Sequence, residues 1–246
     1  MKRLRRLLLT GCIGLTLILT GDRAFAQGDT CCNGGVFIDN FNDGVIGDDW
    51  NSLATDGSRI YEADGVFNMV VAEGPSDTFG SNQVVDADTK EHVLKGNFDV
   101  RVGFQLDPEF HSKPDVDVRL TAEVWREVDG EVTGKVNDSV TISIHKNGYR
   151  SSEEHQDLSG GNWTDYGFSS SDDLGGKLRI TRQGNLITTY YWDHGWVQHA
   201  QWPGVRVSAS DDFKIRLGTF NGESAFSSYW VKWDNLIAHY HQHRAR

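Results

Sequence analysis

Three residues that can recognise a ligand alternate along one segment of the chain. Arg119, Glu123 and Trp125 occupy odd positions, whereas the even positions from Val116 to Val124 are apolar. Successive side chains of an extended strand point to opposite faces, so these three residues share one polar face. An indole stacks on the C–H face of a sugar ring, while charged groups bond its hydroxyls. The row therefore predicts a carbohydrate contact.

Two further residues extend this predicted binding set. His145 and Arg179 lie in other alternating segments and add an imidazole and a guanidinium from separate strands. A structural alternative stays open, in which the whole row forms cross-strand charge pairs on a solvated sheet. Aromatic residues also gather around Tyr191 and Trp196. There the alternation favours packing before recognition.

Hard oxygen ligands lie near the first and last alternating segments. Asp39, Asn40 and Asp43 follow the first segment, and Asp234 falls in the last. Carboxylate and amide oxygens suit Ca²⁺, so these four residues are the predicted ligands of a structural calcium ion, provided that the first and last segments lie side by side, which spacing alone does not establish. Asp and Asn are also common turn residues, which is the alternative interpretation.

The elements that must position these residues are short strands. Beyond Gly35 the sequence alternates with period two, holds few prolines and shows no run of helical periodicity. Turn sequences such as Asn147-Gly148 supply the positive φ that hairpin loops require. Roughly a dozen strands are too many for one open twisted sheet. We therefore predict an all-β chain with two packed antiparallel sheets.

The first residues have the features of a secretory signal peptide. Residues 1–6 are basic, residues 7–19 are largely apolar, and Ala24-Phe25-Ala26 is a small-x-small cleavage site. Cleavage before Cys12, as in a lipoprotein, is the alternative, but it would leave most of the apolar segment on the mature protein. No later segment is continuously apolar, so we expect export without membrane insertion.

These features divide the chain into four parts. We expect a signal peptide at residues 1–26, a flexible lead at 27–35, a β-sandwich at 36–240 and a charged tail at 241–246. The adjacent Cys31 and Cys32 exclude a disulfide framework. His239, His241 and His243 alternate near the end, where a solvated terminus is favoured over a metal site.

The chain is acidic, with a formal net charge of −11. A negative field disfavours nucleic acid and anionic membrane surfaces. It suits cations and neutral ligands such as sugars. The expected partner is therefore a glycan or polysaccharide, and no nucleic-acid partner is expected.

Three stretches resemble bacterial concanavalin A-like lectin/glucanase domains. The first comprises residues 37–44 (FIDNFNDG), Trp50 and residues 60–67 (IYEADGVF). The second runs from residues 176–184 (GKLRITRQG) through to Trp196, and the third is residues 233–236 (WDNL). The resemblance implies a jelly-roll sandwich whose first and last strands are neighbours. It also implies a concave face that often binds glycans and sometimes cleaves them.

Glucanases of that superfamily carry Glu-x-Asp-x-x-Glu on one strand, which sets the nucleophile and the acid on the same face. This chain lacks the motif. Its nearest string, Glu127-Val128-Asp129-Gly130-Glu131, is one residue short and centres on a turn signal. A carboxylate pair assembled from different strands stays open.

The sequence thus predicts an exported carbohydrate-binding sandwich, periplasmic or extracellular and without catalytic activity. Two alternatives remain. One is a glycoside hydrolase or lyase with an unusual site, and the other is a structural or adhesive envelope protein.

Overall fold

A computed structural model describes most of the chain beyond residue 33. The described residues are 34–55, 57–73, 83–91, 93–112, 116–127, 135–145, 147–156, 162–204, 211–221 and 228–241. All of them belong to one compact unit. The predicted signal peptide lies outside the described residues. No helix among the described residues is long and apolar enough to cross a membrane.

Two antiparallel sheets make up the described fold. Sheet A has the order β13 (Trp196–Pro203), β12 (Leu186–Trp192), β11 (Gly175–Gln183), β6 (Asn97–Leu106), β15 (Tyr229–His241), β4 (Val66–Val71) and β3 (Arg59–Ala63), and β1 (Gly34–Asp39) also pairs with β15. Sheet B has the order β10 (Asn162–Ser170), β9 (Tyr149–Gln156), β8 (Lys135–His145), β7 (Val116–Glu127), β14 (Lys214–Asn221), β5 (Gln83–Thr89) and β2 (Trp50–Ala54). One 3₁₀ turn, Phe110–Ser112, interrupts the strands.

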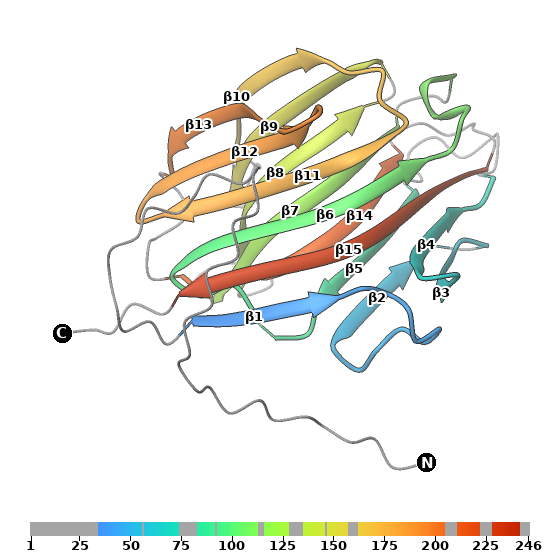
Figure 1. Ribbon diagram of the computed structural model, residues 1–246, viewed down its shortest axis with the longest axis horizontal. Helices are drawn as coiled ribbons and strands as arrows, with labels where there is room; N and C mark the ends of the chain where they lie inside the picture. Colours follow the sequence, from blue (N-terminus) through green and yellow to red (C-terminus); the bar gives the residue numbers. More distant parts are fainter. Residues whose placement is uncertain are drawn as a thin grey trace, which may run out of the picture. The chain divides into compact units, whose positions relative to one another are not determined.

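The sheets lie as two layers, with β11, β6 and β15 in front of β8, β7 and β14 (Figure 1). This arrangement confirms the predicted all-β, two-sheet antiparallel sandwich of jelly-roll type.

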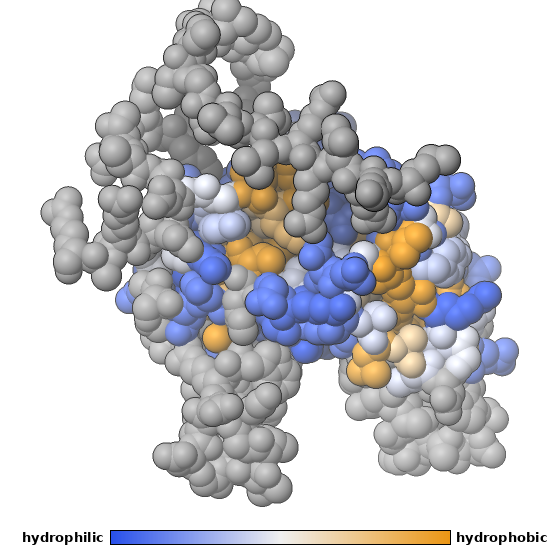
Figure 2. Space-filling model, turned by 90° about the horizontal axis from the view of Figure 1, so that it is seen from below, coloured by the Kyte–Doolittle hydropathy of each residue, from blue (hydrophilic) through white to orange (hydrophobic). Residues whose placement is uncertain are grey.

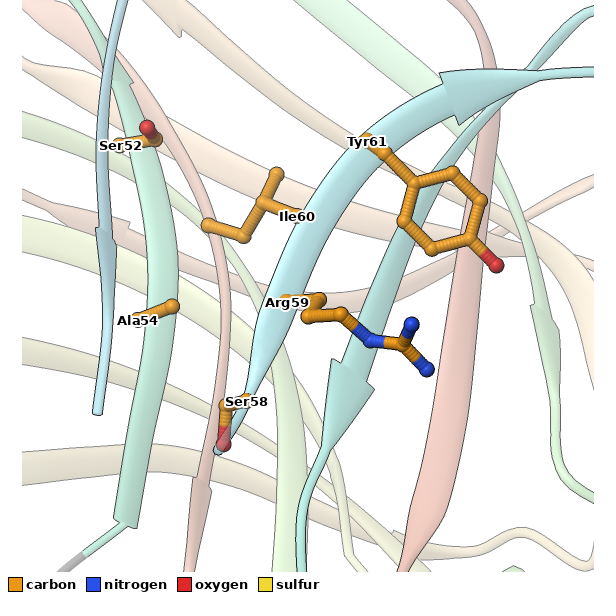
Figure 3. Close-up of a pocket in the computed structure, with 6 residues that line it drawn as sticks. All are labelled: Ser52, Ala54, Ser58, Arg59, Ile60 and Tyr61. Carbon is orange, nitrogen blue, oxygen red and sulfur yellow. The ribbon is translucent and has the colours of Figure 1, made fainter. Parts of the chain in front are cut away.

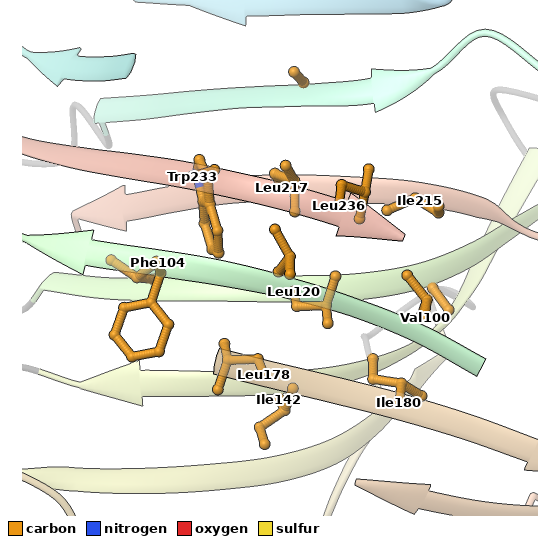
Figure 4. Close-up of a cluster of buried hydrophobic side chains, with 14 of the residues drawn as sticks. Val100, Phe104, Leu120, Ile142, Leu178, Ile180, Ile215, Leu217, Trp233 and Leu236 are labelled. Carbon is orange, nitrogen blue, oxygen red and sulfur yellow. The ribbon is translucent and has the colours of Figure 1, made fainter. Parts of the chain in front are cut away.

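Alternation in the sequence explains why the two layers pack together. Val118, Leu120 and Ala122 of β7 are fully buried, as are Val100 of β6 and Ile180 of β11. Side chains of the two sheets meet between the layers in Figure 4, which labels Val100, Phe104, Leu120, Ile142, Leu178, Ile180, Ile215, Leu217, Trp233 and Leu236. Burial of this apolar surface is the main favourable contribution to folding.

Two polar groups are satisfied within this core. The indole of Trp233 is fully buried, and its Nε1 donates to Sδ of Met69 at 3.3 Å. The guanidinium of Arg182 lies 5.1 Å from the ring centre of Phe98 and 4.7 Å from that of Phe213. It donates to the backbone carbonyls of Gly96 and Asp211. These bonds offset the cost of burying polar groups.

Hairpin turns fall where the sequence supplies positive φ. Gly148 joins β8 to β9 with φ 71°, and Gly184 joins β11 to β12 with φ 58°. His194, with φ 51°, lies in the turn between β12 and β13. Such values are easy for glycine and costly for most other residues.

The first and last described strands extend slightly beyond the predicted sandwich. Gly34 and Gly35, assigned to the flexible lead, pair with His241 and Tyr240 in β1 and β15. Gly35 fits because a Cβ at this position would overlap the Tyr240 ring. Strand pairing therefore begins at Gly34 and ends at His241.

Strand β1 carries an apolar outer surface. Val36 is 54% exposed and Ile38 is 62% exposed. Figure 2, which shows the molecule from below the view of Figure 1, has hydrophobic patches among hydrophilic ones on this side.

Candidate functional site

The outer face of sheet B gathers polar side chains from neighbouring strands. Arg119 of β7 lies opposite Ser143 of β8, which lies opposite Ser151 of β9. Glu123 of β7 likewise lies opposite Ser139. Because residues directly opposite share a face, all of these point away from the core. We call this surface the sheet-B face.

Hydroxyl side chains form the middle of the sheet-B face, and solvent reaches them little. We call this set the hydroxyl floor: Thr121, Ser139, Thr141, Ser143 and Ser151, all between 0% and 6% exposed. Thr121 and Thr141 are hydrogen-bonded at 3.0 Å. The Oγ of Ser143 is buried and has no hydrogen-bond partner. A buried hydroxyl without a hydrogen-bond partner is costly to the fold.

Aromatic side chains stand beside the hydroxyl floor on β9 and β10. Trp163 is 50% exposed and Phe168 is 62% exposed. Trp163 stacks on His155 with ring centres 3.8 Å apart, and Phe168 lies 5.7 Å from Tyr149. We call Tyr149, His155, Trp163 and Phe168 the aromatic rim. A partly exposed ring above a polar floor offers a stacking platform.

Strand β9 also brings a perturbed carboxyl group to the sheet-B face. Glu153 lies opposite Thr141 on one side and Asp165 on the other. Burial raises the pKa of Glu153 to about 7, the Arg119 charge lowers it, and the charges of Asp117 and Asp165 raise it further. At neutral pH this group therefore exists in both protonation states, so it can donate as well as accept a hydrogen bond.

Ion pairs hold the other charged groups of the face. Arg216 contacts the fully buried Glu123 at 2.9 Å, and Lys214 contacts Asp88 at 3.0 Å. Carboxylates outnumber cationic groups among the described residues of this face, which carries Asp86, Asp88, Asp117, Glu123, Glu153 and Asp165 against Arg119, Lys214 and Arg216. Such a face suits neutral ligands better than anionic ones.

Three of the five predicted binding residues lie on one face, but only Arg119 and His145 are neighbours there, through Asp117. Arg119, Glu123 and His145 share the sheet-B face, and Trp125 has Asn137 as its register partner on β8. The side chain of Trp125 lies outside the described residues. Arg179 belongs to β11 in sheet A, so its expected place beside the other four is corrected.

Sequence reasoning missed the aromatic rim. Tyr149, Ser151, Glu153 and His155 do alternate, which is a weak signal for a shared face. The inward positions of β9 hold Arg150, Ser152 and Glu154 instead of an apolar row. Without that row the strand does not show which of its faces is the functional one.

The four predicted calcium ligands do not form one site. Asp39 lies opposite Leu236, which is buried in the core, whereas Asp234 lies opposite Gly103 on the outer face of sheet A. Asn235, with φ 50°, lies where the pairing of β15 with β6 shifts register. Asp234, before the shift, and Leu236, after it, therefore point to opposite faces of sheet A. Among the described residues no group of three or more acidic, His or Cys side chains is placed to hold a metal.

Two of the predicted ligands already have partners. Both oxygens of Asp39 accept hydrogen bonds, from the Phe41 backbone N–H and from Nε1 of Trp50. Asp43 is the second, because it forms a hydrogen bond with Glu62. The pKa of Glu62 is raised to about 7 by burial and then by this hydrogen bond. Because Asp39 and Asp234 also point to opposite faces of sheet A, the four predicted residues do not hold one calcium ion together.

A pocket of about 590 Å³ lies at the edge of the sandwich between β2 and β3. Figure 3 shows Ile60 pointing toward Ser52 and Ala54, whereas Arg59 and Tyr61 point the other way. The polar groups that line this pocket do not converge, so it is a weaker candidate than the sheet-B face.

The fold is similar to those of several solved structures. The CBM2 module of the Lactobacillus casei BL23 phage J-1 evolved Dit gives a TM-score of 0.57 at 11% identity, over 87% of this chain and 98% of that chain. The Bacillus licheniformis β-glucanase gives 0.55 at 10% identity, over 86% and 100%. The exoplasmic/lumenal domain of VIP36, bound to Ca²⁺ and Man3GlcNAc, gives 0.50 at 13% identity, over 75% and 83%.

The likenesses show a concanavalin A-like jelly-roll fold, as the sequence resemblance implied. No family model and no curated protein matches the sequence.

Proposed function

We propose that this protein binds a neutral carbohydrate on the sheet-B face. The observation that carries the proposal is the placement of the exposed Trp163 and Phe168 beside the shielded hydroxyl floor. A sugar presents an apolar ring face and polar hydroxyls together. The aromatic rim would contact the ring face while Arg119 and Glu153 bond the hydroxyls.

The solved structures of similar fold support this choice. One is a carbohydrate-bound lumenal domain, and another is a β-glucanase. Their low identity to this chain leaves the proposal resting on the residues of the sheet-B face. The acidic character of that face favours an uncharged glycan over a charged one.

A glycan array followed by calorimetry tests the proposal. We expect binding to at least one neutral oligosaccharide, and Trp163→Ala should weaken it by roughly 1–3 kcal/mol, the scale of one interfacial aromatic anchor. Tyr61→Ala is the matched control, because Tyr61 is 42% exposed but lies on β3 in sheet A. A protein that binds no glycan on the array is better described as a structural or adhesive envelope protein.

Glycoside hydrolysis is the second candidate, and Glu153 is the residue that favours it. Its pKa of about 7 suits a general acid at neutral pH, and Asp165 lies directly opposite on β10. Directly opposite strand residues have Cβ atoms about 4.5–5.5 Å apart, so the two carboxyl groups can reach one sugar. By contrast, Asp117 and Glu123 on β7 are separated by about 20 Å at the usual strand rise, too far for a catalytic pair.

A reducing-sugar assay on the array ligand separates binding from hydrolysis. Sugar release that Glu153→Gln abolishes would establish the hydrolase. Binding without release would establish the lectin-like protein. The chemistry requires both an acid and a second carboxylate, so Asp165→Asn should abolish release as well.

We also propose that the protein is exported after cleavage behind Ala26. The basic start, the apolar segment and the small residues at Ala24 and Ala26 support this. Intact-mass measurement of the exported protein should give an N-terminus at or near Gln27. A lipid-modified Cys12 would contradict it.

A further inference from the structure

Aromatic and cationic side chains also cluster on the outer face of sheet A, on the other side of the sandwich from the sheet-B face. Trp192 of β12 and Trp196 of β13 are register partners, with ring centres 5.3 Å apart and planes at 86°. Trp192 is 37% exposed. Tyr190 lies two residues before Trp192 on the same face and is opposite Gln198.

Two cations lie over these rings. The Nζ of Lys177 is 4.6 Å from the ring centre of Trp192. The Arg179 guanidinium is 5.0 Å from the ring centre of Tyr190 and 5.4 Å from that of Trp196. We call Lys177, Arg179, Tyr190, Trp192, Trp196 and Gln198 the hairpin cluster.

The two cations are held differently. Asp99 fixes Arg179 through two hydrogen bonds of 2.7 Å, from Nε and Nη2. Lys177 is exposed and reaches Trp192 through a flexible four-carbon chain. An anionic ligand can therefore draw the Lys177 ammonium away from the ring and leave the Trp192 face free for stacking.

The outer face of sheet A is cationic, although the whole chain is acidic. Its described residues include Arg59, Arg101, Lys177, Arg179 and Lys232 against Asp99 and Asp234. The chain as a whole has a formal net charge of −11. The two faces of the sandwich therefore carry opposite local charge and favour different ligands.

We propose that the hairpin cluster is a second binding site, which takes an acidic polysaccharide whose sugar rings bear carboxylates. A ring would stack on Trp192, its carboxylate would pair with Lys177, and the Gln198 amide would bond a hydroxyl. Single strands of nucleic acid also stack on aromatic side chains next to cations. The carboxylate of a uronate is attached to the sugar ring itself, so one residue can pair with Lys177 and stack on the adjacent Trp192, whereas the phosphate of a nucleotide is not attached to its stacking base.

Calorimetric titration with polygalacturonate tests this site. We expect binding that weakens as salt rises, because an ion pair is screened. Trp192→Ala and Lys177→Gln should each lower the affinity at least tenfold. Trp163→Ala on the sheet-B face is the matched control and should leave polygalacturonate binding unchanged.

Three results would overturn the proposal. They are an absence of polygalacturonate binding, an equal loss with Trp163→Ala, and tighter binding of single-stranded DNA than of polygalacturonate. Lys177→Gln keeps the hairpin rings, so it remains informative if Trp192→Ala unfolds the hairpin. Because the control lies on the other sheet, failure here leaves the neutral-glycan proposal standing.

Discussion

Arg119 is clamped by Asp117, two residues earlier on the same strand. Nε of Arg119 donates to Oδ1 of Asp117 at 2.8 Å, and Nη2 donates to Oδ2 at 2.6 Å. The Asp117 side chain is only 9% exposed, whereas that of Arg119 is 30% exposed. The pair therefore fixes the guanidinium at the surface of the sheet-B face, ready to bond a ligand without further loss of side-chain freedom.

Arg119→Lys should reveal the value of this clamp. Lysine keeps the charge but cannot make the two parallel hydrogen bonds, so we expect a loss of about 1–2 kcal/mol in the free energy of unfolding. Urea denaturation measures it. Arg59→Lys, on the outer face of sheet A, should have little effect. Equal stability of Arg119→Lys and the parent would show that the pair contributes charge alone.

The raised pKa of Glu153 predicts a pH-dependent stability. Its ordinary value is 4.5 and its folded value about 7, so between these pH values the folded protein holds a proton that the unfolded chain has released. Stability from this group is therefore present below pH 4.5 and is lost as pH rises toward 7. Glu153→Gln should flatten that fall in thermal melts. Glu62, whose pKa is also about 7, should give a separate and similar share.

His199 should produce the opposite dependence. Burial, followed by the Arg150 charge, lowers its pKa from 6.5 to about 4. Its Nδ1 lies 2.6 Å from Oγ of Ser152, and its Nε2 is buried without a hydrogen-bond partner. The unfolded chain binds the proton first, so stability falls as pH drops from 6.5 to 4. His199→Gln should remove this fall, and an unchanged pH profile would show that His199 is not shielded from solvent.

Arg182 tests the buried end of sheet A. Replacement by Ala removes the side chain between Phe98 and Phe213 and leaves the Gly96 and Asp211 carbonyls without their donor. We expect a loss of about 3 kcal/mol or more in the free energy of unfolding. Arg182→Met should lose less, because it keeps much of the packing volume. If the two variants lose equal stability, the hydrogen bonds rather than the packing dominate.

The sequence predicted those features of the fold that depend only on neighbouring positions in one strand. Period-two alternation put Arg119 and Glu123 on the polar face of β7, because successive side chains of a strand point to opposite faces. Alternation does not reveal which sheet a strand joins. Arg179 was therefore grouped with β7, although β11 pairs with β6 and β12.

Two further differences have local causes. The irregularity at Asn235 shifts the face of Asp234 relative to Asp39, and a one-residue irregularity leaves no clear trace in a period-two pattern. The interior positions of β9 are polar, with Arg150 bonded to Asp173 at 2.6 Å and Ser152 to Thr189 at 2.7 Å. A polar inward row looks like an outward row in the sequence. The sequence alone therefore did not show that Glu153 lies on the outer face.

The most direct test of carbohydrate binding on the sheet-B face is the position of the bound sugar. Amide chemical shifts can be followed by NMR while the tightest neutral oligosaccharide from the array is added. We predict that the changes concentrate on Ser139 to Ser143, Ser151 and the β10 residues Trp163 and Phe168. Changes confined to sheet A, or the absence of any change at saturating sugar, would contradict the proposed site.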